Sequence, residues 1–310
     1  MGLRHLLLLS LAGTVLVAGC DRKATKKTKD LHRAAAAGDL ERCRELVSGG
    51  AEVNARDVAG RTPLHEAARR NRSDVLEFLI SSGADVNASD AQGETVLEAA
   101  VKWGRLSMVE RLVEAGADVN AGGAEGWTLL HSALALTDVN VISLLVENGA
   151  HINVRTDGGW TALHAAAGGY EDAVQLLLDK GAEINTQAEN GRTALDLAAE
   201  GDYKSVVELL LARGAKIHAT NPLGNRALLL YAGRHRRTQL AERVQAVSDT
   251  SELLALQDER GNTPLHDAAD KGDKRMAEFL IELGAGVSML ATSGGPVPCT
   301  WPSSATILMS

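Results

Sequence analysis

The sequence is poor in the residues that build aromatic cores and disulfide frameworks. Its 310 residues include only 3 cysteines, 2 phenylalanines, 3 tyrosines and 4 tryptophans. The cysteines Cys20, Cys43 and Cys299 are too few for a disulfide framework, and their spacing gives no zinc site. The chain is still 45% apolar, so it can bury a core, and its alanine, leucine and valine favour short, closely packed helices.

An excess of positive charge is also lacking. Lysine and arginine number 32 against 40 aspartates and glutamates, which gives a formal net charge of −8. A protein that binds DNA or RNA needs a basic face to neutralise phosphates, so we expect no nucleic-acid partner. The motifs GxSxG, GxxxxGK[ST] and GxGxxG do not occur in the sequence either, and we expect no small-molecule substrate and no cofactor.

The sequence has no apolar run long enough for a transmembrane helix, but it begins with a shorter one. Residues 6–17 form a stretch of 12 apolar and small residues behind Arg4. A spanning helix needs about 20 residues, so this stretch fits the apolar region of a signal peptide at residues 1–19. It ends in Val17-Ala18-Gly19-Cys20, which resembles the bacterial lipobox. The resemblance implies that Cys20 is lipidated; a plain cleaved signal with a chance cysteine is the alternative.

A basic segment at residues 20–30 follows Cys20. Five lysines and arginines lie between Arg22 and Lys29. Next to an acyl chain such a run can bind anionic head groups as a second membrane signal, or it can be a solvated tether. Asp21 resembles the signal that retains some lipoproteins in the inner membrane. We therefore expect a lipid-anchored protein of the bacterial cell envelope that faces the periplasm, with the inner membrane favoured.

Internal repetition organises the rest of the chain. A four-residue motif starts at positions 62, 95, 128, 161, 193, 226 and 263, so successive starts are 33, 33, 33, 32, 33 and 37 residues apart. Its full form is Thr62-Pro-Leu-His65, and a weaker copy, Lys29-Asp-Leu-His32, lies 33 residues before the first. A second motif, such as Gly83-Ala-Asp-Val-Asn87, recurs in phase.

One unit can be interpreted physically from its residues. Thr62 can cap a helix whose first turn tolerates Pro63, and Leu64 belongs to its apolar face. A second helix follows with apolar residues at helical spacing, and Gly83 suits its left-handed end. One unit cannot bury its apolar faces alone, so neighbouring units must stack.

This pattern resembles the ankyrin repeat, over roughly residues 29–287. The resemblance implies an all-α solenoid of about seven to eight helix-turn-helix repeats with β-turn fingers and a concave binding face. We assign the ankyrin repeat domain to residues 31–287 and a disordered tail to residues 288–310. The repeat at about 221–257 is atypical, because its Thr is replaced by Arg226 and it is longer than the others. We expect it to have a longer second helix or a bulged loop.

The recurring histidines look like a ladder, but their pitch excludes a shared metal ion. Stacked repeats lie ~10 Å apart, whereas zinc ligands lie ~2 Å from the metal. His65-Glu66-Ala-Ala-Arg69 resembles the zinc motif HExxH, but Arg69 stands where the second histidine is needed. We expect no metal site. In ankyrin repeats this histidine is a structural hydrogen-bonding residue near the threonine.

The residues that the repeat framework does not explain suggest the binding surface. Three of the four tryptophans fall at variable positions of three consecutive repeats. Tryptophan and arginine are the types most enriched at interface hot spots. The alternative is that the tryptophan rings pack on their own fingers. We predict a protein-binding patch formed by Trp103, Trp127, Trp160, Arg69, Arg70 and Arg192.

These observations lead to three functional hypotheses. The leading one is a membrane-anchored protein–protein interaction module that binds an unidentified partner protein and is not an enzyme. A second is a stabiliser or inhibitor of a specific envelope enzyme. A third is an enzyme that uses residues 226–257, where His235 with Glu242 is the only candidate acid–base pair.

Overall fold

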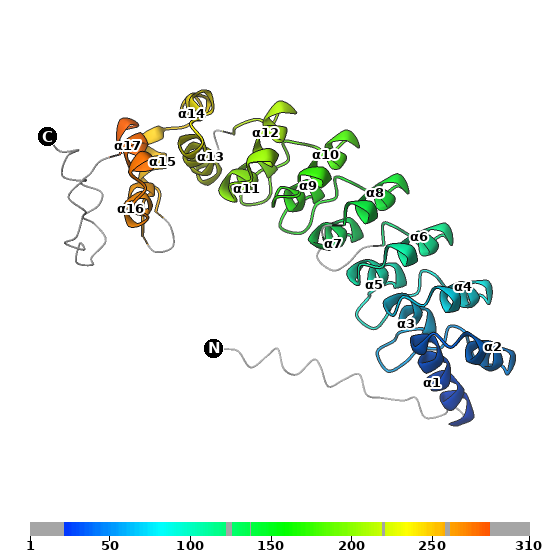
Figure 1. The fold of residues 1–310 in the computed structure, drawn as a ribbon. Coiled ribbons are helices and arrows are strands. Elements are labelled where there is room, and N and C mark those ends of the chain that lie inside the picture. The colour runs from blue at the N-terminus through cyan, green and yellow to red at the C-terminus, as the bar shows by residue number, and fades with distance from the viewer. Residues whose placement is uncertain (1–21, 122–125, 137, 219–220, 258–260, 286–310) are drawn as a thin grey trace. The chain divides into compact units, whose positions relative to one another are not determined.

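The computed structural model describes residues 22–121, 126–136, 138–218, 221–257 and 261–285 as helices joined by short loops (Figure 1). The predicted signal peptide, the lipidation site Cys20 and the tail at residues 288–310 lie outside these described residues. In the described part of the chain, no helix is both apolar enough and long enough to cross a membrane. The chain divides into two units, residues 1–124 with 147–150 and residues 125–146 with 151–310.

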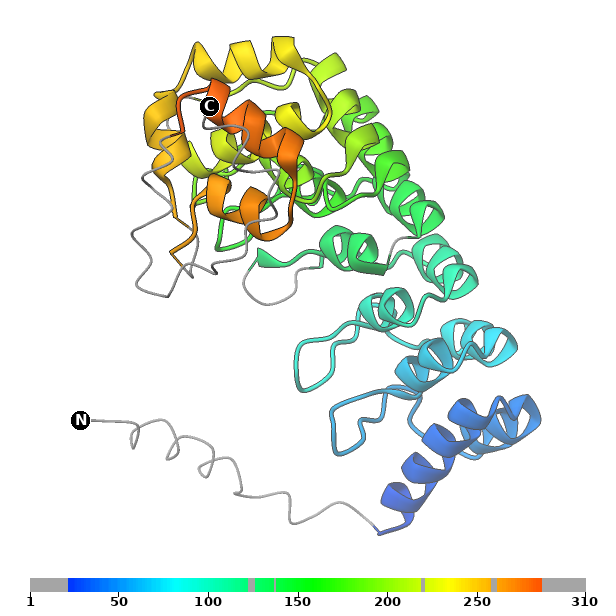
Figure 2. The ribbon, with the colours of Figure 1, turned by 60° about the vertical axis from the view of Figure 1, so that its left-hand side comes forward.

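The first unit stacks its helices in two layers. Within each layer every helix packs on the next (Figure 1). The first layer comprises α1 (Arg22–Ala37), α3 (Pro63–Arg69) and α5 (Val96–Lys102). The second layer comprises α2 (Leu40–Ser48), α4 (Ser73–Ser81) and α6 (Leu106–Glu114). The loops that lead into α3 and α5 project from one side of these layers (Figure 2).

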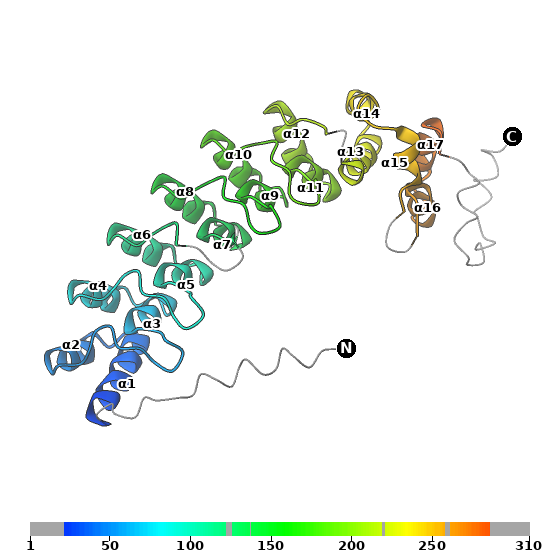
Figure 3. The ribbon, with the colours of Figure 1, turned by 180° about the vertical axis from the view of Figure 1, so that it is seen from behind.

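The second unit continues the same alternation of helices. Its first helices are α7 (Leu129–Leu136), α9 (Ala162–Ala166), α11 (Ala194–Glu200) and α13 (Pro222–Arg234). Its second helices are α8 (Val139–Glu147), α10 (Glu171–Asp179), α12 (Lys204–Ala212) and α14 (Thr238–Gln245). The unit ends with α15 (Thr250–Ala255), α16 (Pro264–Asp270) and α17 (Lys274–Glu282) (Figure 3). The paired helical repeats predicted from the sequence are therefore present.

The motif residues build the core, as predicted. Leu64 is fully buried, and Leu97 and Leu163 are only 1% and 2% exposed. Truncating such a leucine to alanine typically costs about 2–5 kcal/mol, so each motif leucine carries a large share of the stability of its repeat. Cys43 in α2 is also fully buried and packs as a small apolar residue.

Asparagines in the turns that follow the second helices join each repeat to the next. The Asn54 side chain donates to the Gly83 carbonyl at 3.0 Å and accepts the Asp85 backbone N–H at 2.8 Å. Asn87 makes the equivalent pair of bonds one repeat later, to Gly116 and Asp118. Because these side chains satisfy backbone groups at the helix end, they fix the spacing between repeats.

The projecting loops are closed by backbone hydrogen bonds and touch one another. In the loop before α3, the Gly60 N–H donates to the Asp57 carbonyl and the Asp57 N–H donates to the Arg61 carbonyl, both at 2.9 Å. The Ala91 N–H of the next loop donates to the Ala59 carbonyl at 2.9 Å. A row of bonded loops is a stiff edge beside the first layer of helices.

The structure differs from the sequence-based expectation at the start of the chain. Residues 22–30, which we assigned to a tether, are the first turns of α1. Lys27 of this segment donates to the Gly49 carbonyl at the end of α2, at 2.7 Å. The basic segment, from Arg22 onward, is thus part of the stacked fold.

The prediction of a longer second helix or a bulged loop in the atypical repeat is wrong. Its second helix, α14, has only 8 residues, whereas its first helix, α13, has 13. The sequence that lengthens this repeat folds into the separate helix α15, which Asp249 caps by accepting the Ser251 N–H. The early start of α13 has a local cause, since Asn221 caps it and Pro222 suits its first turn.

Candidate protein-binding surface

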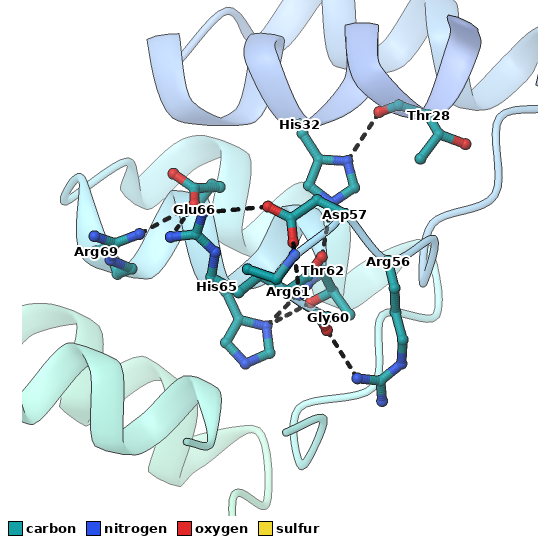
Figure 4. Close-up of polar contacts among 11 residues, drawn as sticks. Thr28, His32, Arg56, Asp57, Gly60, Arg61, Thr62, His65, Glu66 and Arg69 are labelled. Carbon is teal, nitrogen blue, oxygen red and sulfur yellow. Dashed lines mark hydrogen bonds and ion pairs between the residues drawn. The ribbon is translucent and has the colours of Figure 1, made fainter. Parts of the chain in front are cut away.

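The motif histidines are structural, as their hydrogen bonds show (Figure 4). The Thr62 N–H donates to His65 Nδ1 at 3.1 Å, and the Thr62 hydroxyl lies 2.9 Å from the same nitrogen. A backbone N–H can only donate, so Nδ1 accepts and Nε2 carries the proton of the neutral ring. His65 Nε2 lies 3.3 Å from the Glu94 carbonyl of the next repeat. His65 therefore caps its own helix and joins two repeats.

The same arrangement recurs at His131, His164 and His266, each of which accepts the backbone N–H of its own motif threonine. Burial lowers the pKa of His65, His131 and His164 below the ordinary value of 6.5. His32 differs, because its two ring nitrogens lie 2.8 Å from the Thr28 and Arg61 carbonyls. No group of three or more histidine, cysteine or carboxylate side chains is placed to hold a metal ion in the part of the chain that the structure describes.

Glu98 and Asp196 stand where the motif has histidine, and the two side chains make different contacts. Glu98 donates its backbone N–H to the Thr95 hydroxyl at 3.1 Å and directs its carboxylate to Lys102, also at 3.1 Å. Asp196 keeps the position of the histidine and accepts the Thr193 N–H and hydroxyl, both at 2.8 Å. Burial raises the pKa of Asp196, and the hydrogen bonds from Thr193 act against that rise.

In the first unit, the structure brings together two residues of the predicted patch. The Arg69 guanidinium lies over the Trp103 ring, 5.5 Å from its centroid. Glu66 also pairs with Arg69, with 3.2 Å between Arg69 Nη1 and Glu66 Oε1. Arg61 in turn pairs with Glu66 at 3.1 Å (Figure 4). Trp103 is nevertheless 52% exposed, so its ring is held in place while much of its surface contacts solvent.

Arg70 is the third patch residue of this unit, and it is exposed on the end of α3. Sequence reasoning missed Glu66, the residue that fixes Arg69. The signal was present, because Glu66 precedes Arg69 by three positions in a helix, a spacing at which side chains meet.

The other three patch residues lie in the second unit. The Trp127 ring is 42% exposed and stacks on His131 with 5.3 Å between ring centroids. Trp160 stacks on His164 at 5.8 Å, but it is only half-buried rather than exposed. Arg192 pairs with Glu200 at 2.7 Å. The structure thus divides the patch into two groups of three, one in each unit.

The candidate acid–base pair of the enzyme hypothesis does not form. His235 Nε2 lies 2.7 Å from Asp202 Oδ1, and no bond joins His235 to Glu242 in the described structure. Arg234 also pairs with Asp202, at 3.0 Å. Asp202 is 33 positions before His235, so it belongs to the preceding repeat and serves as a structural partner between repeats.

Comparison with known proteins identifies the family to which the repeats belong. A family model described as "Ankyrin repeats (3 copies)" matches residues 31–123, 120–188 and 159–221. A model of a single ankyrin repeat matches residues 260–292. The stretch between these matches, residues 222–259, is the atypical repeat with its early helix α13 and extra helix α15. No curated protein matches the chain.

Proposed function

We propose that this chain, which belongs to the ankyrin repeat family, is a membrane-anchored protein-binding module of the bacterial cell envelope and not an enzyme. Ankyrin repeats support a role in protein–protein interaction. A stack of repeats offers an extended surface for a partner and needs no cofactor for this.

One observation carries the proposal, the exposure of aromatic rings on a rigid scaffold. Trp103 and Trp127 are 52% and 42% exposed, although a tryptophan contributes to folding mainly when it is buried. Arg69 and Glu66 hold the Trp103 ring before any partner arrives, which lowers the entropy cost of binding. Tryptophan and arginine in such a setting have the composition of an interface hot spot.

The anchor is proposed from the sequence of the first thirty residues. Val17-Ala18-Gly19-Cys20 supports lipidation of Cys20. Lys26, Lys27 and Lys29 lie close behind it on α1, where they can add attraction to anionic lipid head groups. We place the repeats in the periplasm, with the inner membrane favoured.

Two changes test the binding surface. Trp127→Ala with Trp160→Ala removes both rings of the second unit, and the tagged protein is then used for pull-downs from solubilised membranes. The control variant Tyr170→Ala removes an aromatic ring of similar exposure at a loop outside the patch. We expect the partner to be lost with the tryptophan variant and kept with the control. Recovery of the same partner with both variants would show that the patch is not the binding surface.

The anchor is tested separately with Cys20→Ser. We expect this variant to lose incorporation of labelled palmitate and to move from the membrane to the soluble fraction. A Cys20→Ser protein that still incorporates the label would contradict lipidation at this residue.

A further inference from the structure

The atypical repeat replaces a projecting loop by a turn of helix. In other repeats of the described structure, the five residues before the motif form a closed loop, as in residues 57–61 and 188–192. The equivalent residues 221–225 are the cap and first turn of α13. This early start brings Leu223 to the surface with 49% of its area exposed.

Buried polar contacts hold this extra turn against α11. The Asn221 side chain donates to Asp196 Oδ2 at 2.6 Å, and both residues are at least 95% buried. Gly224 allows the close approach, because a Cβ at this position would lie only 2.4 Å from the Asp196 Cγ. The turn is therefore fixed in one position, and the surface beside it is formed before any ligand binds.

The surface beside this turn is a groove of about 460 Å³, lined by residues of α11, the loop before α11, α13 and the segment after α15. That volume lies within the usual range for ligand pockets. Its apolar lining residues include Leu223, Ala227 and Leu230. Its charged lining residues are three arginines and one glutamate, Arg192, Arg226, Arg234 and Glu200.

Among the residues that the structure describes, no carboxylate pairs with Arg226 of this groove. Arg192 pairs with Glu200 at 2.7 Å, and Arg234 pairs with Asp202 at 3.0 Å. The Arg226 guanidinium donates to the Leu256 carbonyl at 3.2 Å, a neutral acceptor, and makes no ion pair within the described residues. A guanidinium has five N–H donors in a planar fork, so Arg226 keeps donors for a carboxylate. The lining of the groove thus carries an excess of positive charge, although the whole chain has a net charge of −8.

We propose that this groove binds an acidic, extended segment of a partner protein, with one apolar side chain of the segment packed against Leu223, Ala227 and Leu230. A carboxylate of the segment pairs with Arg226, next to the apolar contact. The inference goes beyond the tryptophan patch, because it assigns a second contact region and the chemistry of its ligand. Arg192 is the one residue that belongs to both.

A peptide array tests the proposal with the full-length chain in detergent micelles. The array carries randomised nonamers in glutamate/aspartate-rich, serine/glycine-rich and lysine/arginine-rich backgrounds, each with a central leucine or a central glycine. We expect the acidic peptides with leucine to retain the protein most strongly, and retention to fall as salt concentration rises. Equal retention by the acidic and basic backgrounds would overturn the proposal.

Variants locate the binding on the chain. Arg226→Gln and Leu223→Ser should each weaken retention by the acidic leucine peptides roughly tenfold or more. Lys204→Gln, which removes a charge from α12 in the other layer, is the matched control and should have no such effect. Retention unchanged in both groove variants would refute the assignment. Because Leu223 is half exposed, its variant should keep the wild-type helical circular dichroism.

The tryptophan variant separates this inference from the proposed function. Trp127→Ala with Trp160→Ala should leave retention on the acidic peptides unchanged, since neither residue lines the groove. If that variant loses the cellular partner but keeps the peptides, both proposals stand. If the groove variants alone lose the peptides while the tryptophan variant keeps the partner, only the tryptophan patch fails.

Discussion

Restoring the motif histidine at Asp196 should destabilise the protein. By sequence, Asp196→His completes the motif at Thr193, so pattern matching predicts a gain. In the structure, Asp196 Oδ2 accepts from the Thr193 N–H, the Thr193 hydroxyl and the Asn221 amide. A neutral imidazole can replace the first two contacts through Nδ1, but its Nε2–H then faces the Asn221 amide, which is also a donor.

The size of the loss follows from these contacts. A hydrogen bond to a charged group contributes about 1.5–3 kcal/mol, and the Asn221 amide would stay buried without an acceptor. The larger ring must also fit where a single Cβ added at Gly224 would already lie 2.4 Å from the Asp196 Cγ, and such overpacking typically costs about 1–3 kcal/mol. We expect a total near 3 kcal/mol.

Hydrogen exchange measured by mass spectrometry is the suitable assay, because long repeat arrays need not unfold in one step. A loss near 3 kcal/mol accelerates exchange in α11 and α13 roughly hundredfold. Asp196→Asn is the control, since its amide oxygen can accept the same hydrogen bonds without a buried charge, and it should change stability by less than about 1 kcal/mol. If Asp196→His exchanges at the wild-type rate or more slowly, our account of this contact is incorrect.

Three further predictions follow from single residues. Because burial lowers the pKa of His65, the unfolded chain binds its proton more readily than the folded chain. The contribution of His65 to the free energy of unfolding is complete above about pH 6.5 and is lost as the pH falls from there toward the lowered pKa of the folded state. Hydrogen exchange in α3, corrected for intrinsic rates, should therefore accelerate when the pH is lowered from about 7.5 to about 5.5. Burial raises the pKa of the Cys43 thiol to about 11, so iodoacetamide should label this residue only under denaturing conditions, as read by peptide mass spectrometry; rapid labelling of the native protein would contradict the burial. Gly159→Ala and Gly181→Ala both place alanine at a positive φ, but only at Gly159 would the new Cβ crowd a neighbouring loop, 2.9 Å from the Glu189 nitrogen. Gly159→Ala should therefore accelerate hydrogen exchange in its own repeat more than Gly181→Ala does, roughly fivefold for a difference of about 1 kcal/mol, and equal acceleration would count against this packing.

The parts of the fold that sequence reasoning predicted depend on neighbours in the chain. Thr62, Leu64 and His65 interact within one helical turn, so their spacing alone indicates the cap, the buried face and the hydrogen bond. The early start of α13 had a comparable local signal in Asn221-Pro222, an N-cap followed by a first-turn proline.

Apart from Glu66, the contacts that sequence reasoning missed join residues one repeat apart. Arg69 meets Trp103, and His235 meets Asp202 rather than Glu242, across 34 and 33 positions. Within a repeat no pattern shows which of several charged side chains in the next repeat is the partner. In the candidate binding patch, Trp103 and Trp127 are exposed, whereas Trp160 lies beside Gly158 of its own loop, as the alternative interpretation expected.

The asparagine contacts between repeats have a consequence for how such a chain can change in length. Asn54 and Asn87 form the same two bonds with equivalent partners one repeat later. A duplication or deletion of one whole unit therefore presents every asparagine with the same pair of backbone groups, whereas a change of any other length leaves them mispaired. Whole units can thus be added or removed without changing these contacts, whereas the contacts of the atypical segment, such as Asn221 with Asp196, have no equivalent to be paired with in another unit.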